Sequence, residues 1–319
     1  MNWTRREFVA GSGLAILASC GRSGAKLIGV IPKATSHLFF LSVHAGVNAA
    51  AHDLHVEVLW NGPQNETDYA RQIEIVDSMV TRGVSAIAIS ATDQEALAAP
   101  VERAIRAGIP VTVFDSAVNV TDYVSFIATD NYGAGCTAAR TLAGFIGARG
   151  KVGMVMQKPG GTSTVLREQG FDATIAKEFP SVQVVARQYG MADPARSRAA
   201  AEDILTAHPD LAGIFASSEA ASLGSIQAIK NRNLSGKIKL VTFDFSKAHV
   251  EALRDGTTNA MLVQNPYQLG YESVKSLVEK LNGQTPPKKV ELPARVIVKA
   301  DLAKPEVRAL IEPDWLKGQ

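Results

Sequence analysis

Short apolar runs alternate with longer helical patterns over the first 129 residues. Residues 27–31, 56–60, 86–89 and 110–114 read as strands, and 39–54, 68–81 and 94–107 read as helices. In the helix over 68–81, Ile73, Val76 and Val80 fall on one face. Strands that are apolar throughout, each followed by a helix, are typical of a parallel sheet covered on both faces.

The same alternation restarts after residue 129. It predicts strands over 151–156, 182–186, 213–216 and 240–243, with helices over 132–147, 166–178, 195–207 and 222–230. Later elements over 260–263, 267–281 and 295–298 are too few for a third domain and are expected to complete the first two sheets. The pattern predicts an α/β fold of two Rossmann-like, doubly wound parallel-sheet lobes.

Composition narrows the class of protein. The chain has 319 residues, of which 46% are hydrophobic and 20% charged, and its formal net charge is +2. This balance gives no broad electrostatic reason to expect nucleic acid as a partner. Its two cysteines, Cys20 and Cys136, do not provide a disulfide scaffold or a Cys-based zinc site.

The sequence contains no clear motif for phosphate binding, metal binding or nucleophilic catalysis. The run from Gly160 to Ser163 lacks the Gly-Lys-Ser/Thr of a P-loop, and Gly133 and Gly135 lie inside a helical pattern. The six histidines show no metal-ligand spacing with carboxylates, and no nucleophile elbow is present. We therefore predict a protein that is not an enzyme and that uses no metal and no cofactor.

The amino terminus reads as an export signal. Arg5 and Arg6 precede a short apolar stretch over 9–18, which resembles a twin-arginine signal, and Leu17-Ala18-Ser19-Cys20 resembles a lipobox. We expect residues 1–25 to be signal peptide and tether, with a lipid on Cys20 anchoring the protein in the periplasm or at the cell surface. The alternative is an ordinary first helix with a buried cysteine.

Polar phrases follow the predicted strands throughout the chain. They include Ile31-Pro32-Lys33, Ser36 to Phe40, Phe114-Asp115-Ser116, Ala128 to Asn131, Gly161-Thr162-Ser163, Arg167 to Phe171, Ala207 to Asp210, Thr242-Phe243-Asp244 and Val263 to Pro266. In their order and spacing these phrases resemble the ribose-type (cluster B, type I) periplasmic sugar-binding proteins of ABC transporters.

The resemblance implies a domain plan and a function. Two lobes would be joined by three crossovers, with residues 26–129 plus 265–293 in the first lobe and 130–264 plus 294–319 in the second lobe and tail. A monomer would capture a sugar or polyol by lobe closure and deliver it to an ABC permease and ATPase complex. Nucleic acid is not an expected partner.

Ligands of open parallel sheets bind beyond the carboxyl ends of the strands, where these phrases lie. Phe39 and Phe40 would cover the apolar face of a sugar ring, although both also fit core packing of the first helix, Phe40 in particular. Asp115 and Asp244 would accept hydrogen bonds from hydroxyls, and the alternative for each is a helix N-cap.

Arg167 would present its planar guanidinium to hydroxyls or to a carboxylate, with a surface salt bridge as the alternative. Gln264, at the third crossover, can both donate and accept hydrogen bonds.

Four further candidates depart from the ribose pattern. Lys33 stands where ribose binders carry a small polar residue, His37 replaces an amide, Ser116 replaces an arginine and Ser218 replaces an asparagine. Lys33 together with Asp115 and Ser116 resembles the branch that includes rhamnose and furanosyl autoinducer receptors. A pentose, hexose, deoxysugar, polyol or autoinducer remains open as the ligand, and a rim salt bridge is an alternative role for Lys33.

Two other functions share the predicted architecture. A sensor would present the same ligand to a membrane receptor, and the sequence does not separate this role from import. The effector domain of a LacI-like repressor would need an amino-terminal helix-turn-helix, whereas here the core is expected to begin near Lys26 behind an export signal. We therefore favour import.

Overall fold

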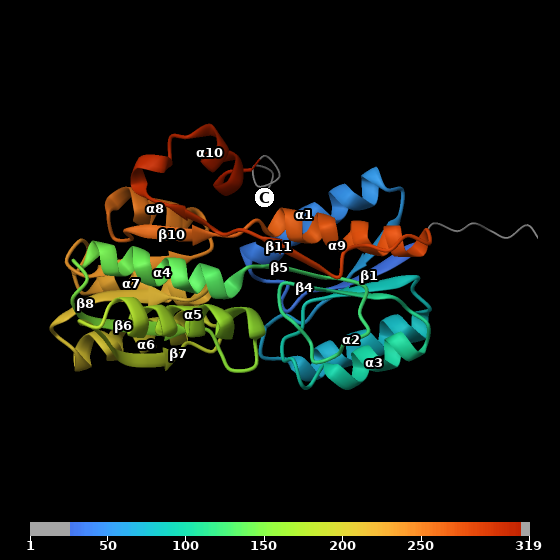
Figure 1. The fold of residues 1–319 in the computed structure, drawn as a ribbon, viewed down its shortest axis with the longest axis horizontal. Coiled ribbons are helices and arrows are strands. Elements are labelled where there is room, and N and C mark those ends of the chain that lie inside the picture. Colours follow the sequence, from blue (N-terminus) through green and yellow to red (C-terminus); the bar gives the residue numbers. More distant parts are fainter. Residues whose placement is uncertain (1–25, 314–319) are drawn as a thin grey trace, which may run out of the picture.

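The computed structural model describes residues 26–313 and folds them into two α/β lobes that lie side by side (Figure 1). The strand order is β11-β5-β4-β3-β1-β2 in one six-stranded sheet and β12-β10-β9-β8-β6-β7 in the other. We call the lobes that contain them the N-lobe and the C-lobe. The predicted signal segment, residues 1–25 with Cys20, and the last residues, 314–319, lie outside the described part.

The N-lobe sheet is parallel throughout its described pairs. Ile28 and Val30 of its first strand pack in one hydrophobic cluster, and Ile31 packs in a second cluster on the other face. The apolar run therefore needs helices on both faces, because successive strand side chains point to opposite faces. The elements are β1 (Leu27–Ile31), α1 (Leu38–Asp53), β2 (Glu57–Trp60), α2 (Tyr69–Arg82), β3 (Ala86–Ile89), α3 (Ala98–Arg106), β4 (Val111–Phe114), β5 (Phe126–Thr129), α9 (Pro266–Leu281) and β11 (Lys289–Leu292).

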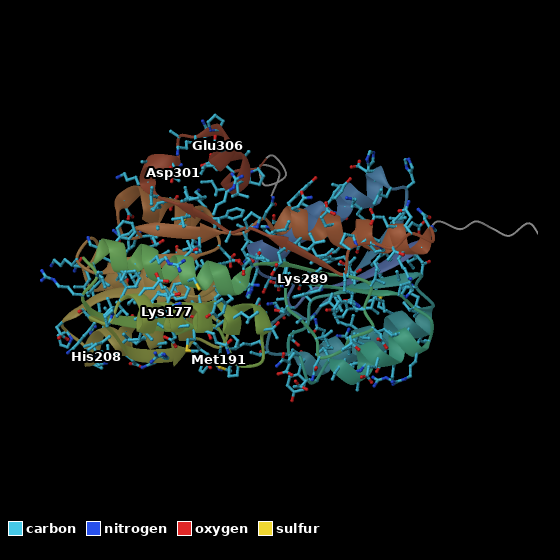
Figure 2. All side chains as sticks on the ribbon, viewed as in Figure 1. Lys177, Met191, His208, Lys289, Asp301 and Glu306 are labelled. Carbon is cyan, nitrogen blue, oxygen red and sulfur yellow. The ribbon has the colours of Figure 1, made fainter. Side chains whose placement is uncertain are left out.

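The C-lobe repeats this plan, with one edge strand, β12, running antiparallel to β10. The final helix covers this edge: Asp301 and Glu306 lie above α8 and β10 (Figure 2), and Val307 packs with Phe245 and Met261. The elements are α4 (Asn131–Phe145), β6 (Gly150–Met156), α5 (Thr162–Glu178), β7 (Val182–Tyr189), α6 (Pro194–Ala207), β8 (Leu211–Ala216), α7 (Glu219–Asn231), β9 (Lys239–Phe243), α8 (Lys247–Asp255), β10 (Ala260–Val263), β12 (Arg295–Ile297), η1 (Lys299–Asp301) and α10 (Pro305–Ile311).

The chain passes between the lobes three times. It leaves the N-lobe sheet after β5, returns after β10 to form α9, and crosses again between β11 and β12. Figure 1 shows these connections running through the middle of the molecule. The two doubly wound lobes and the three crossovers confirm the predicted fold.

Glycines allow close helix contacts in both lobes. A Cβ on Gly46 would lie 1.9 Å from the carbonyl oxygen of Tyr267 in α9, and one on Gly270 would lie 2.1 Å from that of Val43 in α1. In the C-lobe, a Cβ on Gly135 would lie 2.0 Å from the carbonyl oxygen of Arg167. Gly135 therefore serves helix packing, so the structure gives a role to a glycine that the sequence left unexplained.

Five elements were missing from the predictions: β5, α8, β11, η1 and α10. The β5 strand has four residues, and β11 alternates exposed lysine and glutamate with partly buried residues, as an edge strand can. The helices α8 and α10 have only nine and seven residues, too short for a clear helical period. None of the helices within residues 26–313 combines the length and the apolar character that crossing a bilayer requires.

Candidate ligand-binding site

A cavity lies between the two lobes, at the carboxyl ends of their strands. Nine of the ten predicted site residues line it, and the tenth, Ser116, lies behind it, with its hydroxyl 3.0 Å from the ammonium of Lys33. Residues from distant parts of the sequence therefore meet in one place. The lining residues are Lys33, His37, Phe39, Phe40, Glu66, Asp115, Gln157, Ser163, Thr164, Arg167, Ser218, Glu219, Asp244 and Gln264.

Two aspartates end equivalent strands of the two sheets. Asp115 follows β4 and has φ 56°, and Asp244 follows β9 and has φ 68°. The Asp115 backbone N–H donates to Ile127, and that of Asp244 donates to Leu262, so each residue is still held by the neighbouring strand. Positive φ is uncommon for residues other than glycine, and such strain gathers at functional sites.

Asp115 forms a buried ion pair with Lys33 at 2.9 Å and accepts a hydrogen bond from Ser90 at 2.8 Å. The lysine also lies 3.7 Å from Glu66 and donates to Ser163 of the C-lobe at 3.3 Å. Burial by itself lowers the pKa of Lys33, but the charges of Asp115 and Glu66 outweigh it and raise the pKa. Lys33 is therefore a fixed cation inside the site, not a rim salt bridge.

Arg167 is buried in the C-lobe wall. Its Nε donates to Asn131 at 2.8 Å, one terminal nitrogen donates to the Ser217 carbonyl at 3.0 Å, and the guanidinium lies 3.8 Å from the centre of the Phe243 ring. Burial lowers the pKa of Arg167 from its usual value, but an arginine stays charged in proteins. These contacts fix the plane of the group and exclude the alternative of a surface salt bridge.

Asp244 and Gln264 form a connected pair. Gln264 follows β10 and therefore lies at the second crossing between the lobes, not at the third as predicted, because the third crossing lies later, between β11 and β12. The Gln264 amide donates to Asp244 at 2.7 Å, and its oxygen accepts from Thr129 at 2.7 Å. The Thr129 contact joins the end of an N-lobe strand to the end of a C-lobe strand. Burial raises the pKa of Asp244 above its ordinary value, although Arg167 opposes the shift.

Phe39 and Phe40 both line the cavity, with ring centres 5.0 Å apart and planes at 86°. Phe40 is 1% exposed and also belongs to the N-lobe core. Phe39 belongs to the same core cluster, so core packing and a place beside the cavity are compatible for both rings.

His37 and Ser218 sit at the starts of helices. His37 precedes α1, and its Nδ1 lies 3.2 Å from Glu66. Burial lowers the pKa of His37, but its hydrogen bond to Glu66 and the charges of Glu66 and Glu219 together raise it above its usual value. Ser218 accepts from the Ala221 backbone N–H as the N-cap of α7 and also contacts Gln157.

Five further residues line the cavity and were not predicted from the sequence: Glu66, Gln157, Ser163, Thr164 and Glu219. Gln157 directly follows β6, so the rule that found Asp115 also applies to it. Glu66 lies in the loop between β2 and α2, on the same edge of the N-lobe sheet. Lys33, His37 and Lys158 together hold the pKa of the Glu66 carboxyl far below its usual range, against the effect of burial.

The lobes touch around the cavity. The Lys158 ammonium donates to the Thr92 carbonyl at 2.5 Å, and the Ala117 backbone N–H donates to Thr162 at 2.7 Å. Gln157 reaches across to Glu66 at 3.2 Å. The structure thus shows the lobes in a closed arrangement.

The sequence is similar to those of known periplasmic sugar-binding proteins. Residues 28–285 match the family model described as the periplasmic binding protein domain. The chain is 29% identical over 270 residues to the ribose import binding protein of Bacillus subtilis, covering 84% of this chain and 86% of that protein. It is also 29% identical over 269 residues to the D-ribose/D-allose-binding protein of Pseudomonas aeruginosa, with 81% and 83% covered.

The fold is also similar to those of solved solute-binding proteins. A solute-binding protein from Agrobacterium vitis, bound with alpha-D-tagatopyranose, superposes with a TM-score of 0.86 at 32% identity, covering 89% of this chain and 98% of that one. Another from Agrobacterium radiobacter, in complex with D-arabinose, gives 0.88 at 32% identity, with 91% and 99% covered. The chain therefore belongs to the periplasmic binding protein family, among the solute-binding proteins of ABC transporters.

Proposed function

We propose that this protein captures a sugar or polyol between its lobes and delivers it to an ABC importer. The observation that carries the proposal is the convergence of Asp115, Arg167, Asp244 and Gln264, from both lobes, on one cavity with Phe39 at its edge. Carboxylates, a guanidinium and an amide are the groups that hold hydroxyls, and a phenyl ring covers the apolar face of a sugar. Relatives in complex with tagatose and arabinose support this assignment.

Binding would drive closure because the ligand contacts both lobes at once. The ligand must favour the closed form, and about 5.5 kcal/mol of differential affinity is enough even to invert a 99:1 open-to-closed ratio. Hydrogen bonds to charged groups contribute about 1.5–3 kcal/mol each, so a few bonds to Asp115, Arg167 and Asp244 are sufficient. The role needs no chemical step, and we propose none.

We further propose that the ligand is a sugar other than ribose. Lys33 occupies part of the space in front of Asp115 and satisfies one of its oxygens, whereas Ser116 supplies no cation there. A ligand on this side meets an ammonium already paired with a carboxylate. A deoxysugar, ketose or furanosyl compound fits this donor set, and the branch resemblance points the same way.

The test is a thermal-shift screen of the mature domain against pentoses, hexoses, deoxysugars, ketoses and polyols. A ligand at about 100 times its Kd stabilises the folded state by about 2.7 kcal/mol. At least one neutral sugar should raise Tm, and Asp244→Ala should abolish the rise. If no member of the panel raises Tm and no sugar is released from purified protein on denaturation, the proposal fails.

The cellular location of the protein is a second part of the proposal. Proteins of this family that serve ABC importers are periplasmic, and we propose that twin-arginine export and a lipid on Cys20 bring this chain there and anchor it as a monomer. Wild-type protein should then fractionate with membranes and Cys20→Ala protein should not. Equal release of both from the membrane would refute the lipid anchor.

The domain limits are also proposed: residues 26–129 plus 265–293 for the N-lobe and 130–264 plus 294–319 for the C-lobe and tail. Sheet membership of β5, β11 and β12 on either side of these limits supports them.

A further inference from the structure

The first helix of the N-lobe is capped by a residue of the C-lobe. The Glu219 carboxylate accepts hydrogen bonds from the backbone N–H groups of Phe39 at 3.1 Å and Leu38 at 3.4 Å, which open α1. In the described structure the side chain of His37, the N-cap residue, makes no hydrogen bond to this turn. The donors that a helix start leaves free are thus met across the gap between the lobes.

Other helices are capped within their own lobe. Asp68 accepts from Arg71 at the start of α2, Asp130 from Gly133 at α4, and Asp193 from Arg196 at α6. Their caps do not depend on how the lobes are placed. The cap of α1 does, because separating the lobes removes Glu219 from it.

The capping contact belongs to a closed ring of contacts between the two helix starts. His37 contacts Glu66 at 3.2 Å, Glu66 accepts from Gln157 at 3.2 Å, and Gln157 contacts Ser218, the N-cap of α7. Glu219 follows Ser218 and returns the ring to α1. The ring crosses between the lobes twice.

We propose that Glu219 is a positioning residue for lobe closure: its bond to the start of α1 forms only when the lobes meet, and it sets both the open-to-closed balance and the placement of Phe39. This inference rests on the proposed function, since it assigns a role within sugar capture. It differs from ligand contact, because the bond joins Glu219 directly to the backbone of the other lobe, with no sugar between them.

The surroundings of Glu219 make the contact sensitive to pH. Facing it are His37 from the loop before α1 and Asp244 after β9, and the same cavity holds Lys33, Glu66, Asp115 and Arg167. Burial raises the pKa of Glu219 to about 7, with Asp244 adding to the rise and His37 opposing it. Opening the lobes would return the pKa toward its ordinary value. Closure therefore takes up a proton, and this part of its stability is lost as pH rises through about 7.

The experiment compares wild type, Glu219→Ala, Glu219→Gln and the matched control Asp193→Ala, which removes a carboxylate cap that lies within one lobe. Small-angle scattering is measured without sugar, and affinity is measured with the best sugar of the screen. Glu219→Ala should increase the radius of gyration of the sugar-free protein and weaken binding about 5- to 10-fold, in line with the loss of a helix cap. Glu219→Gln should fall between and show a smaller change of affinity from about pH 5 to pH 8.

Asp193→Ala should lower Tm without changing the scattering or the affinity. Wild-type scattering and affinity in Glu219→Ala would overturn the inference, and so would an equal loss of affinity in Asp193→Ala. Weaker binding with unchanged sugar-free scattering would assign Glu219 to ligand contact and also overturn it. If wild type binds no sugar at all, the proposed function fails, and the scattering comparison still decides the role of Glu219.

Discussion

Asp115 and Asp244 face the same cavity from opposite lobes, each in a left-handed backbone conformation directly after a buried strand. Their partners differ: Asp115 pairs with the ammonium of Lys33 at 2.9 Å, whereas Asp244 accepts from the neutral amide of Gln264 at 2.7 Å. The shared backbone conformation indicates that the two aspartates occupy equivalent positions in the two lobes. The different partners predict different responses to substitution.

Asp115→Ala should destabilise the protein as well as abolish binding. It removes the nearest partner of a buried ammonium and leaves Lys33 with Glu66 at 3.7 Å. Breaking a buried ion pair on one side costs about 3 kcal/mol or more, and we expect about 3 kcal/mol in the free energy of urea unfolding. The double variant Lys33→Met with Asp115→Leu should recover part of this loss. A single variant as stable as wild type would contradict the pairing.

Asp244→Asn should weaken sugar binding about 10- to 100-fold, because it replaces a charge-assisted hydrogen bond by a neutral one. Its stability at neutral pH should not fall, since burial disfavours the ionised form of Asp244 and an amide oxygen can still accept from Gln264. Titration calorimetry measures the first effect and urea unfolding the second. A large loss of stability with unchanged affinity would reverse the assignment.

Because Glu168 is a buried carboxyl, we predict that the free energy of unfolding falls between about pH 5 and pH 8. Burial raises its pKa to about 7, while its bonds to Ser217 and to the backbone N–H of Gln157 oppose the rise. A carboxyl whose pKa is raised on folding contributes stability that is present at low pH and lost as pH rises through that value. Tm of wild type should therefore decrease over this range, and Tm of Glu168→Gln should decrease less. Identical profiles would show that Glu168 does not titrate there.

Gly135→Ala should destabilise the C-lobe and weaken sugar binding. The new methyl group would meet the carbonyl oxygen of Arg167 at 2.0 Å, so α5 must move and carry the guanidinium with it. Overpacking of this kind typically costs about 1–3 kcal/mol. Gly144→Ala is the matched control in the same helix, because a Cβ there meets nothing within 4 Å. It should be neutral or slightly stabilising. Equal Tm values for the two variants would contradict the close contact.

The sequence was informative where one local rule suffices. Apolar strands followed by helices predicted both sheets, and polar residues at strand ends predicted Asp115 and Asp244. Gln157 obeys the same rule and was passed over, because glutamine after a strand resembles an ordinary loop residue. The edge strand β11 was missed because its lysine and glutamate read as loop, although neighbours in space make it a strand.

Glu219 was beyond the reach of sequence patterns for another reason. A glutamate in the first turn of a helix is explained well enough by the dipole of its own helix. That it serves the start of α1, 180 residues away in the chain, depends on how the two lobes meet. Residues that act between lobes are invisible to rules that consider one element at a time.

The facing glycines of the helix pairs have a consequence for how ligand specificity can change in such a binding protein. Gly46 with Gly270, and Gly135 with Gly170, fix a tight helix pair in each half of the molecule. Such tight packing favours rotation of each half as a rigid body, with bending in the three connecting segments. Lys33 and Ser116 lie outside these helix contacts, so a new specificity can arise by exchanging the wall of the gap while the machinery that shuts it stays the same.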